Sequence, residues 1–463
     1  MLAPKGQSSR STINADDERL GVGLWQVVKL SDVTRHHSGN SKLIKGRLHD
    51  APGSGLHPAF SASGQDVWHD SYDQEGDAII VSAVGARCGK CFLASGRWSA
   101  IANTHVVWPV LERIDRKFLW YRINDEQFWI RSGSAQPFVV VRKTFDRPLP
   151  LPPLPVQRRI VADIEKQFTR LEAGVTALRR VQAGLKRYRA TVLKAACEGR
   201  LVSMEAERLR AEGETLKEED TGGALLRRIL NRRRERFEQE KTSGGRKKYD
   251  EPSPIEPGTL PITPAGWTLA SAEAVCSSVR DGTHDTPAYV QDGVPLITSK
   301  NLLPCGLDFE NVKLVSREDH IEIGKRSGVE RGDILFAMIG TIGNPVVVET
   351  DREFSIKNVG VFKGNPDFIL SRYLRYWFMS PPFTRWLEQK QRGTTQKFVP
   401  LGLLRAFVVA LPPLAEQKRI VAEVERRLSV IEELEAAVSA NLQRAGRLRQ
   451  SILSRLFQQP NRC

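Results

Sequence analysis

The side chains best suited to recognition chemistry lie in the six-residue segment Arg392-Gly-Thr-Thr-Gln-Lys397. Arginine can bond guanine, and glutamine can bond adenine, through two coplanar hydrogen bonds each. Lysine and hydroxyl groups suit phosphate oxygens, and a glycine lets the backbone approach a ligand closely. We therefore interpret 392–397 as a candidate DNA-contacting loop. A polar surface turn is the alternative interpretation.

Arg131-Ser-Gly-Ser-Ala-Gln136 is a segment of similar character earlier in the chain. From the two loops we select as DNA-contacting candidates Arg131, Ser134, Gln136, Arg392, Thr394, Thr395, Gln396 and Lys397. Further candidates, chosen as basic or amide side chains, are Lys42, Lys45, Arg47, Arg87, Asn103, Lys300, Asn301, Asn344, Lys357 and Asn358. Ordinary solvated or turn positions are the alternative for each of these.

Two segments resemble catalytic motifs but lack the context that the chemistry needs. Ser380-Pro-Pro-Phe383 matches the (Asn/Asp/Ser)-Pro-Pro-aromatic segment of amino-methyltransferases, yet no glycine-rich turn for S-adenosylmethionine accompanies it. Gly85-Ala-Arg-Cys-Gly-Lys90 is followed by a cysteine where a phosphate loop needs Ser or Thr, and its glycines are spaced too closely. We find no Asp…Glu-x-Lys nuclease constellation and no metal-binding set of histidines. The sequence predicts no catalysis by this chain alone.

Composition limits the class of protein. The chain has 463 residues, 40% of them hydrophobic, which is too long for a single core and suggests about three domains. Its net charge of +15 favours a polyanionic partner, nucleic acid above all, although a merely soluble basic protein is the alternative. Only Cys88 and Cys91 of the six cysteines are closely spaced, so we expect reduced thiols and no zinc site. With no leader and no long apolar run, we expect a cytoplasmic protein without a membrane partner.

The chain repeats itself. Segment 151–165 recurs at 411–425 with ten identities in fifteen positions, all at one offset (417 − 157 = 260). Average composition would give about one identity by chance. The shared residues begin Leu-Pro-Pro-Leu and continue with Gln, Arg, Ile, Val, Ala and Glu. This spacing exceeds that of solenoid repeats, and we interpret it as a duplicated half.

Each copy of the repeat is predicted to open a long helix, over about 157–199 and 417–457. Apolar residues recur mostly at steps of three and four, with a few longer gaps, from Ile160 to Val192 and from Ile420 to Leu456, which is typical of a heptad seam. The proline-rich approach 149–155 is predicted not to be helical. A helix of this length spans about 65 Å. Because its narrow apolar stripe cannot bury itself, we expect the two helices to pack as an antiparallel coiled coil.

A globular segment precedes each helix. The first has strand-like runs at 78–81, 104–108 and 138–142, and the second echoes it: Gly76-Asp77 corresponds to Gly332-Asp333, and Ile101 with Asn103 to Ile356 with Asn358. We therefore predict an α+β fold in which two similar globular domains alternate with two long helices. The predicted boundaries are a polar segment 1–20, a first domain 21–150, a central helix 151–202, a basic helical linker 203–260, a second domain 261–410 and a C-terminal helix 411–463. The basic linker stretch 225–236 is interpreted either as a solvated face or as a nucleic-acid contact.

The motifs Leu-Pro-Pro-Leu-x-x-Gln-x-Arg-Ile-Val at 151–161 and 411–421, each closing a globular domain and opening a helix, are the most specific in the chain. They are supported by Asp281-Gly-Thr-His-Asp-Thr-Pro287, Gly332-Asp-Ile-Leu335, Gly393-Thr-Thr-Gln396 and the linker helix. Together, over about residues 20–460, they make the chain resemble the specificity subunits of type I restriction-modification systems. The first domain departs from that pattern, because it has Ser134-Ala135 where the second has Thr394-Thr395 and lacks a clear Asp-Gly-Thr-His segment.

The resemblance implies that each target-recognition domain reads one half of a bipartite site in double-stranded DNA. It implies that the paired helices fix the spacing and dock two modification (methyltransferase) subunits, and that restriction (translocase-nuclease) subunits join the complex. It further implies no cofactor on this chain, with S-adenosylmethionine, ATP and Mg on the partner subunits. The alternatives are a fused methyltransferase-nuclease chain, supported only by 380–383, and a coiled-coil adaptor with no role on DNA.

Overall fold

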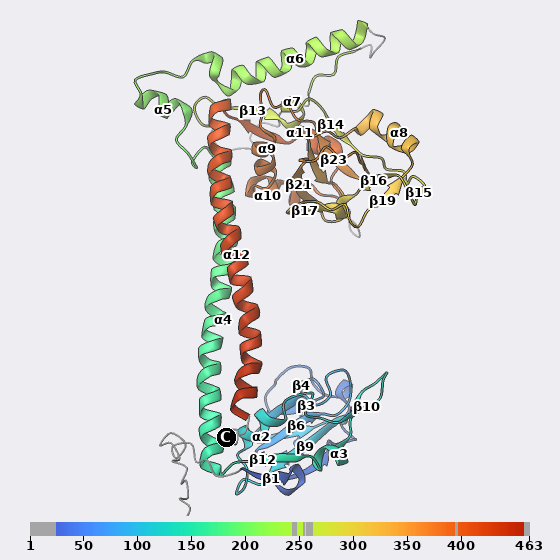
Figure 1. Ribbon diagram of the computed structural model, residues 1–463, viewed down its shortest axis with the longest axis vertical. Helices are drawn as coiled ribbons and strands as arrows, with labels where there is room; N and C mark the ends of the chain where they lie inside the picture. Colours follow the sequence, from blue (N-terminus) through green and yellow to red (C-terminus); the bar gives the residue numbers. More distant parts are fainter. Residues whose placement is uncertain (1–24, 243–247, 253–254, 256–262, 394–396, 458–463) are drawn as a thin grey trace, which may run out of the picture. The chain divides into compact units, whose positions relative to one another are not determined.

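The computed structural model describes residues 25–242, 248–252, 255, 263–393 and 397–457 (Figure 1). They divide into two compact units, one with the residues up to 179 and from 439 on, the other with 180–438. Each unit contains a globular domain with two four-stranded sheets, together with part of each long helix. The fold class is the predicted one: two similar α+β domains that alternate with two long helices.

The first domain is closed by an antiparallel ribbon of its first and last strands, β1 (Gln26–Lys29) and β12 (Pro148–Leu151). One sheet has the order β2 (Thr34–Ser38), β9 (Thr104–Pro109), β6 (Ala78–Ser82) and β7 (Cys91–Ala94). The other has the order β4 (Gly64–His69), β3 (His57–Ser61), β8 (Arg97–Ala100) and β5 (Gln74–Glu75). The remaining elements are η1 (Leu30–Asp32), η2 (Lys45–Arg47), α2 (Arg116–Ile123), β10 (Arg131–Ser132), β11 (Phe138–Val139) and α3 (Val141–Phe145).

The second domain follows the same plan. Its closing ribbon is β13 (Thr268–Ser271) with β24 (Val408–Leu411). One sheet has the order β14 (Val279–Asp281), β23 (Val359–Phe362), β20 (Ile334–Ala337) and β21 (Gly343–Val347), and the other β15 (Tyr289–Val290), β19 (Lys313–Val315), β16 (Val294–Ile297) and β22 (Ser355–Ile356). The remaining elements are α7 (Ala272–Val275), η4 (Ser299–Asn301), β17 (Leu302–Leu303), β18 (Gly306–Leu307), α8 (Arg317–Ser327), α9 (Ser371–Phe378), α10 (Pro381–Lys390) and α11 (Leu401–Ala406).

Strand register shows that the two domains are copies of one another. Ile79 pairs with Val107 in the first domain, and Ile334 pairs with Phe362 in the second, at the same offset (334 − 79 = 255). Helices α2 and α9 keep this offset, while the later hairpin and long helix have an offset of 260. Helix α10 occupies this interval in the second domain and has no counterpart in the first, which accounts for the change.

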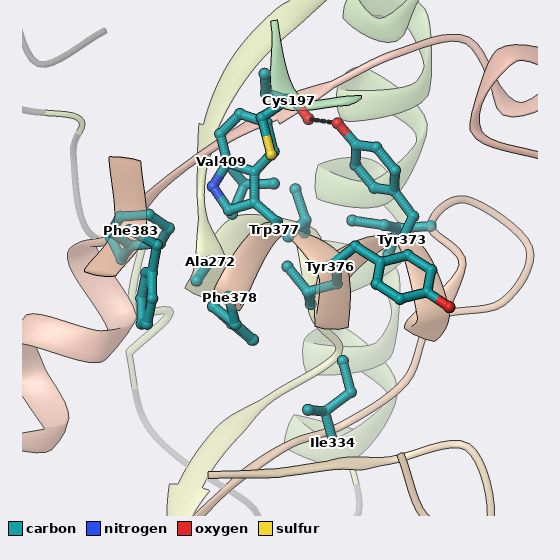
Figure 2. Close-up of a cluster of buried hydrophobic side chains, with 14 of the residues drawn as sticks. Cys197, Ala272, Ile334, Tyr373, Tyr376, Trp377, Phe378, Phe383 and Val409 are labelled. Atoms are coloured by element: carbon teal, nitrogen blue, oxygen red, sulfur yellow. Dashed lines mark hydrogen bonds between the residues drawn. The ribbon is translucent and has the colours of Figure 1, made fainter. Parts of the chain in front are cut away.

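The core of the second domain is built on the aromatic face of α9 (Figure 2). Tyr373 and Trp377, one helical turn apart, are 2% exposed and pack with Phe378 and Phe383. Tyr373 Oη donates to the Ala410 carbonyl at 2.8 Å, and Trp377 Nε1 donates to the Val408 carbonyl at 3.1 Å. Buried aromatic rings with satisfied polar atoms therefore fasten α9 to β24, the strand that leads into the C-terminal helix.

The long helices α4 (Leu154–Cys197) and α12 (Leu414–Phe457) pack against each other in both units. In the unit with 180–438, Arg189 pairs with Glu435 at 3.0 Å and with Glu432 at 3.6 Å, while Arg419, near the start of α12, bonds the Ser203 carbonyl beyond the end of α4. In the other unit, Phe168 shares an apolar cluster with Ile452, and the Arg449 guanidinium lies 4.8 Å from the Phe168 ring. Both sets of contacts are antiparallel, as predicted.

The residues of the repeated motif form one joint twice. The buried Gln157 side chain accepts from Asp115 N–H at 2.8 Å and donates to the carbonyls of Arg113 (3.1 Å) and Pro152 (2.7 Å). Gln417 does the same with Leu370 N–H (3.0 Å) and the carbonyls of Phe368 (3.1 Å) and Pro412 (3.1 Å). Each glutamine thus ties a long helix to the backbone at the start of α2 or α9.

An ion pair completes each joint. Glu165 pairs with Lys117 of α2, and Glu425 pairs with Arg372 of α9. Both pairs are partly exposed, so each contributes at most about 1 kcal/mol. Ile160 and Ile420, two apolar members of the motif, are buried. The ten repeated identities therefore mark the attachment of helix to domain.

Two sequence-based expectations are wrong in detail. Helix α4 begins at Leu154, so Pro155 lies in its first turn, where a missing N–H costs no intrahelical hydrogen bond. The apolar run 138–142 is not a continuous strand: β11 ends at Val139 and α3 begins at Val141. There, Val140 N–H bonds the Ile130 carbonyl at 2.7 Å and Thr144 Oγ1 bonds the Val140 carbonyl at 2.9 Å, so local contacts override the strand preference of valine.

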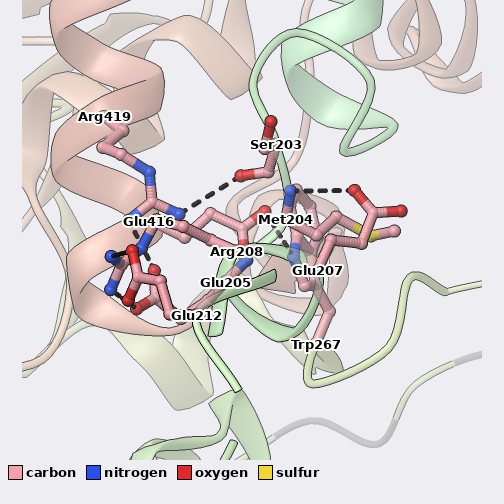
Figure 3. Close-up of polar contacts among 9 residues, drawn as sticks. All are labelled: Ser203, Met204, Glu205, Glu207, Arg208, Glu212, Trp267, Glu416 and Arg419. Atoms are coloured by element: carbon pink, nitrogen blue, oxygen red, sulfur yellow. Dashed lines mark hydrogen bonds and ion pairs between the residues drawn. The ribbon is translucent and has the colours of Figure 1, made fainter. Parts of the chain in front are cut away.

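The linker contains α5 (Glu205–Ala211), η3 (Glu218–Asp220) and α6 (Gly222–Thr242), and its start is held on α12 (Figure 3). The Glu416 carboxylate accepts from Glu205 N–H and from Trp267 Nε1, both at 3.0 Å. Burial raises the pKa of Glu416. Burial also acts to raise the pKa of Glu205, but hydrogen bonds from Arg208 and Arg419 outweigh it and leave that pKa lowered.

In the part of the chain that the structure describes, no helix is both long and apolar enough to cross a membrane.

Substitution Gln417→Leu should destabilise the full-length chain by about 3 kcal/mol, because it leaves one backbone N–H and two carbonyls buried without partners. Lys418→Leu, at the exposed neighbouring position, is the matched control and should change stability by less than about 0.5 kcal/mol. Urea unfolding followed by circular dichroism measures both. Equal stability of the two variants would show that the side-chain amide of Gln417 does not hold α12 to the second domain.

Candidate nucleic-acid interface

A hollow of about 540 Å³ on the second domain brings together four of the predicted residues. Its lining includes Lys300 and Asn301 of η4, and Lys357 and Asn358 from the turn between β22 and β23. Residues 339–341, which follow β20, form another wall. These segments are far apart in the sequence and meet because β16 and β22 pair in parallel, with Leu296 opposite Ser355.

The turn at Lys357–Asn358 is held in place by backbone and side-chain bonds. Lys357 N–H bonds the Ile297 carbonyl at 2.9 Å, and its ammonium group contacts Thr286. Asn358 has φ 55°, and its Oδ1 lies 3.1 Å from His284 Nδ1. Asn103, its counterpart in the first domain, has φ 68°. Asparagine tolerates this left-handed conformation better than most residues, so both positions have a conformational reason to be asparagine.

The Asp-Gly-Thr-His segment has a structural counterpart in the first domain after all. A Cβ on Gly282 would lie 2.2 Å from the Ile356 carbonyl oxygen, and a Cβ on Gly39 would lie 2.2 Å from the Ile101 carbonyl oxygen. Gly282 N–H bonds Val359 and Gly39 N–H bonds Thr104, each at 2.9 Å. Only glycine fits such a close backbone approach, and Gly39 therefore marks the equivalent turn.

The two predicted loops are β-hairpins of the same register. Arg392 and Phe398 exchange two backbone hydrogen bonds of 2.8 Å, and Ser132 pairs with Phe138 in the first domain. Gly133 and Gly393 have φ of 88° and 94°. Gly340, which lines the hollow, donates to the Lys397 carbonyl at 3.1 Å, so the second hairpin borders the hollow. Thr394, Thr395 and Gln396 lie outside the described residues.

In the first domain, the predicted DNA-contacting residues lie around the Asn103 turn, which is equivalent to the Asn358 turn of the second domain. Gly85 N–H bonds the Pro137 carbonyl at 2.8 Å and Ala83 N–H bonds the Asn103 carbonyl at 2.9 Å, which joins the hairpin to the asparagine turn. Asn40 N–H bonds the Ala100 carbonyl, which places the 40–43 loop beside the same turn. Exposed predicted residues on these segments and their neighbours are Lys42, Arg47, Arg87, Asn103, Arg131, Ser134 and Gln136.

Several predicted residues already have partners within the fold. Lys45 pairs with Asp66, and Arg131 pairs with Glu126 at 3.4 Å. Asn301 is 3% exposed: its Oδ1 accepts from Thr298, and its Nδ2 donates to the Asn311 carbonyl at 3.1 Å. Asn344 is not brought to the hollow. It bonds the Leu302 carbonyl at 3.3 Å and lines a separate cavity near α10.

Sequence reasoning missed several residues of the hollow, Lys313 and Tyr289 among them, and one pair on the hairpins. Lys313 on β19 and Tyr289 on β15 line the hollow, with Lys313 Nζ 5.9 Å from the centre of the Tyr289 ring. Phe138 is 44% and Phe398 39% exposed, unusual for phenylalanine at matched positions. The repeat of phenylalanine at 138 and 398 could have identified these two residues from the sequence. Lys313 and Tyr289 could not be identified in this way, because no local sequence pattern shows that β15 pairs with β19.

The charges of the hollow come from lysine. Lys300, Lys313 and Lys357 face a lining with hydroxyl and amide groups from Thr298, Ser299 and Asn311. On the first domain, burial and the neighbouring histidines lower the pKa values of His36 and His105, which favours neutral rings there at neutral pH. Among the described residues no group of three or more His, Cys, Asp or Glu could hold a metal ion. The hollow is suited to binding an anion with polar edges.

The segment that resembles a methyltransferase motif is a helix start. Ser380 caps α10: its Oγ accepts from Phe383 N–H at 3.5 Å, and prolines occupy the first helical positions. Ser380 is fully buried, and Phe383 is 1% exposed within the apolar core. These side chains are therefore used in folding.

Comparison with known proteins identifies the relatives of this architecture. The family described as "Type I restriction modification DNA specificity domain" matches residues 317–444. The type I restriction enzyme EcoBI specificity subunit of Escherichia coli is 26% identical over 319 residues, which span 67% of this chain and 58% of that subunit. The EcoDI specificity subunit of Escherichia coli is 22% identical over 441 residues, 94% of this chain and 88% of that subunit. A solved structure described as a type I R-M system covers 94% of this chain and 98% of its own, with 16% identity and a TM-score of 0.61, and so shares the fold.

Replacing Lys300 and Lys357 together by glutamine should weaken binding of the full-length chain to duplex DNA, with little dependence on base sequence. Each lost phosphate contact should lower the slope of log affinity against log salt by about one unit, hence about two in total. The double variant Lys217→Gln/Lys418→Gln removes two exposed lysines elsewhere in the same unit and should leave the slope unchanged. Fluorescence anisotropy across a salt series measures the DNA affinity and its salt dependence for both double variants. Identical slopes for both double variants would place DNA elsewhere.

Proposed function

We propose that the chain, like the type I restriction enzyme specificity subunits to which it is similar, reads a bipartite sequence in double-stranded DNA, each globular domain contacting one half-site. The observation that supports this best is the matched pair of surfaces: hairpin, asparagine turn and glycine turn occupy the same positions in both domains. The side chains on those positions differ, for example Ser134-Ala135 against Thr394-Thr395. One scaffold with two different surfaces is suited to a site with two unlike halves.

The long helices set the gap between the half-sites in this proposal. Inter-helix contacts such as Arg189 with Glu432 and Glu435 hold their register. The joints at Gln157 and Gln417 fasten each domain to its helix. A fixed gap between the half-sites requires a rigid attachment at both joints, because motion of a domain relative to its helix would vary the distance between the half-sites.

Chemistry belongs to partner subunits in this proposal. Modification subunits, two per complex, supply S-adenosylmethionine-dependent DNA methylation, and restriction subunits supply ATP- and Mg-dependent cleavage. The isolated chain, incubated with labelled S-adenosylmethionine and DNA, should transfer no methyl group until modification subunits are added. Transfer by the isolated chain would contradict a purely recognising role.

A groove between the helices supports their use as a docking surface for the modification subunits. Within the unit that holds 439–457, a hollow of about 470 Å³ is lined by Leu171, Val175 and Leu178 of α4 and by Leu448 of α12. Leu448 is 48% exposed, and a Cβ on Gly174, also in the lining, would meet nothing within 4 Å. A half-open apolar seam on an otherwise charged helix pair is typical of a protein interface.

Substitution Val175→Gln/Leu448→Gln should weaken association with the modification subunits by roughly tenfold or more, since it places polar groups in a buried contact. The chain itself should stay folded, because both side chains are partly exposed. Val430→Gln, at an exposed apolar position of α12 outside the groove, is the control. Isothermal titration calorimetry measures the association. Unchanged affinity of the double variant would exclude this groove as the docking surface.

Insertion of seven residues after Arg189 and another seven after Glu432 should widen the gap in the recognised site by about three base pairs. Seven residues preserve the heptad seam and add about 10.5 Å of helix, and DNA rises 3.4 Å per base pair. Base-resolution methylation mapping in cells with the modification subunits should show both half-sites unchanged. A changed half-site sequence, or an unchanged gap, would contradict the role of the helices.

A further inference from the structure

A second hollow in the unit with 180–438 lies between the linker helix α6 and the second domain. Its volume is about 700 Å³, and we call it the linker cleft. Its walls are the second half of α6, the strand pair β14–β23, the end of α8 and the loop 364–367. Its basic lining residues are Arg232, Arg233, Arg236, Lys248, Arg280, Lys325, Arg326 and Lys363, against the acidic residues Asp250, Glu330 and Asp367.

Side-chain contacts hold the linker helix α6 against the second domain, and these contacts define the shape of the cleft. Arg233 donates to the Glu273 carbonyl at 2.9 Å, and Arg232 pairs with Asp367 at 2.5 Å. The Phe237 and Tyr249 rings pack edge to face with centroids 5.3 Å apart, which holds the returning chain against α6. These contacts come from both sides of the cleft.

Internal ion pairs leave the cleft with an excess of positive charge. Lys325 pairs with Glu322, and Lys363 pairs with Asp333 at 3.0 Å. Within the described ranges, neither Arg236 nor Lys248 has an ion-pair partner. Clustered like charges on a concave surface focus the field and attract a polyanion.

A chain of hydrogen bonds links the linker cleft to the hollow that carries the predicted DNA contacts. One oxygen of the buried Asp281 carboxylate bonds Arg326 of the cleft, and the other lies 2.9 Å from His284 Nε2. His284 in turn contacts Asn358 of the hollow at 3.1 Å. Strand β23 runs from beside Asn358 to beside Lys363, and five residues of strand span about 17 Å. That distance corresponds to about five base pairs of DNA.

We propose that the linker cleft binds the phosphate backbone of duplex DNA outside the half-site read by the second domain. This inference rests on the proposed function and extends it to flanking DNA. A duplex that lies over the hollow carries a continuous row of phosphates, and the cleft lies about 17 Å from Asn358 along β23, within reach of that row. Contact there is made by arginine and lysine to phosphate, and so adds affinity without sequence preference.

The test uses the assembled complex of this chain with modification subunits and two duplexes that carry both half-sites. One duplex ends at the outer edge of the second domain's half-site, and the other continues about ten base pairs beyond. Arg236→Gln/Lys248→Gln should bind the longer duplex roughly tenfold more weakly than the unchanged complex does. Its salt slope on that duplex should be lower by about two units. On the shorter duplex the two complexes should be equal.

The control Arg210→Gln/Lys217→Gln removes two exposed basic residues of the same linker that do not line the cleft, and both duplexes should bind it normally. Equal losses on both duplexes, or no loss on either, would overturn the proposal. Weakened assembly with modification subunits and unchanged DNA binding would also overturn it, by assigning the cleft to an acidic protein surface. Failure of the proposed function is distinguishable, because the unchanged complex would then fail to prefer the half-sites over scrambled sequence.

Discussion

The structure depends on a buried primary amide that appears twice. Gln157 and Gln417 each satisfy two carbonyls and one N–H at a place where a strand ends, prolines interrupt the ladder and a long helix begins. No water competes for these bonds, since both side chains are fully buried. The direction in which each helix leaves its domain is therefore set by hydrogen-bond geometry. Apolar contacts of Ile160 and Ile420 add stability, but they are non-directional.

Much of this architecture was predictable because its information is local or repeated. Proline pairs, heptad spacing and a constant offset predicted the helices, their antiparallel packing and the two-domain plan. The details that sequence reasoning missed depend on tertiary contacts. Gly39 stands between Ser38 and Asn40 and resembles Asp281-Gly-Thr-His only through its approach to the Ile101 carbonyl. Val140 and Val141 have strand-forming side chains, but neighbouring bonds begin a helix at Val141.

The candidate surface was predictable in part for the same reason. Residue type alone selected Lys300, Lys357 and Asn358, and the structure gathers them in one hollow. It could not select Lys313 and Tyr289, whose place depends on which strands pair. Residue type also could not separate amides that hydrogen-bond within the fold from amides that remain exposed. Asn301, for example, makes three hydrogen bonds to Thr298 and Asn311. Whether the selected side chains contact bases stays a prediction.

The repeated joint between helix and domain also has a consequence for the evolution of such a chain. The hydrogen bonds of Gln157 and Gln417 and the ion pairs of Glu165 and Glu425 all join the segments 151–165 and 411–425 to backbone or side chains at the start of α2 and α9. Genetic recombination that exchanges a whole domain between two such genes, with crossover points in the stretches that encode the proline motifs, keeps each glutamine opposite the same backbone groups. Under the proposed function, a lineage would thereby acquire a new target in one event, with the hydrogen bonds of both glutamines retained.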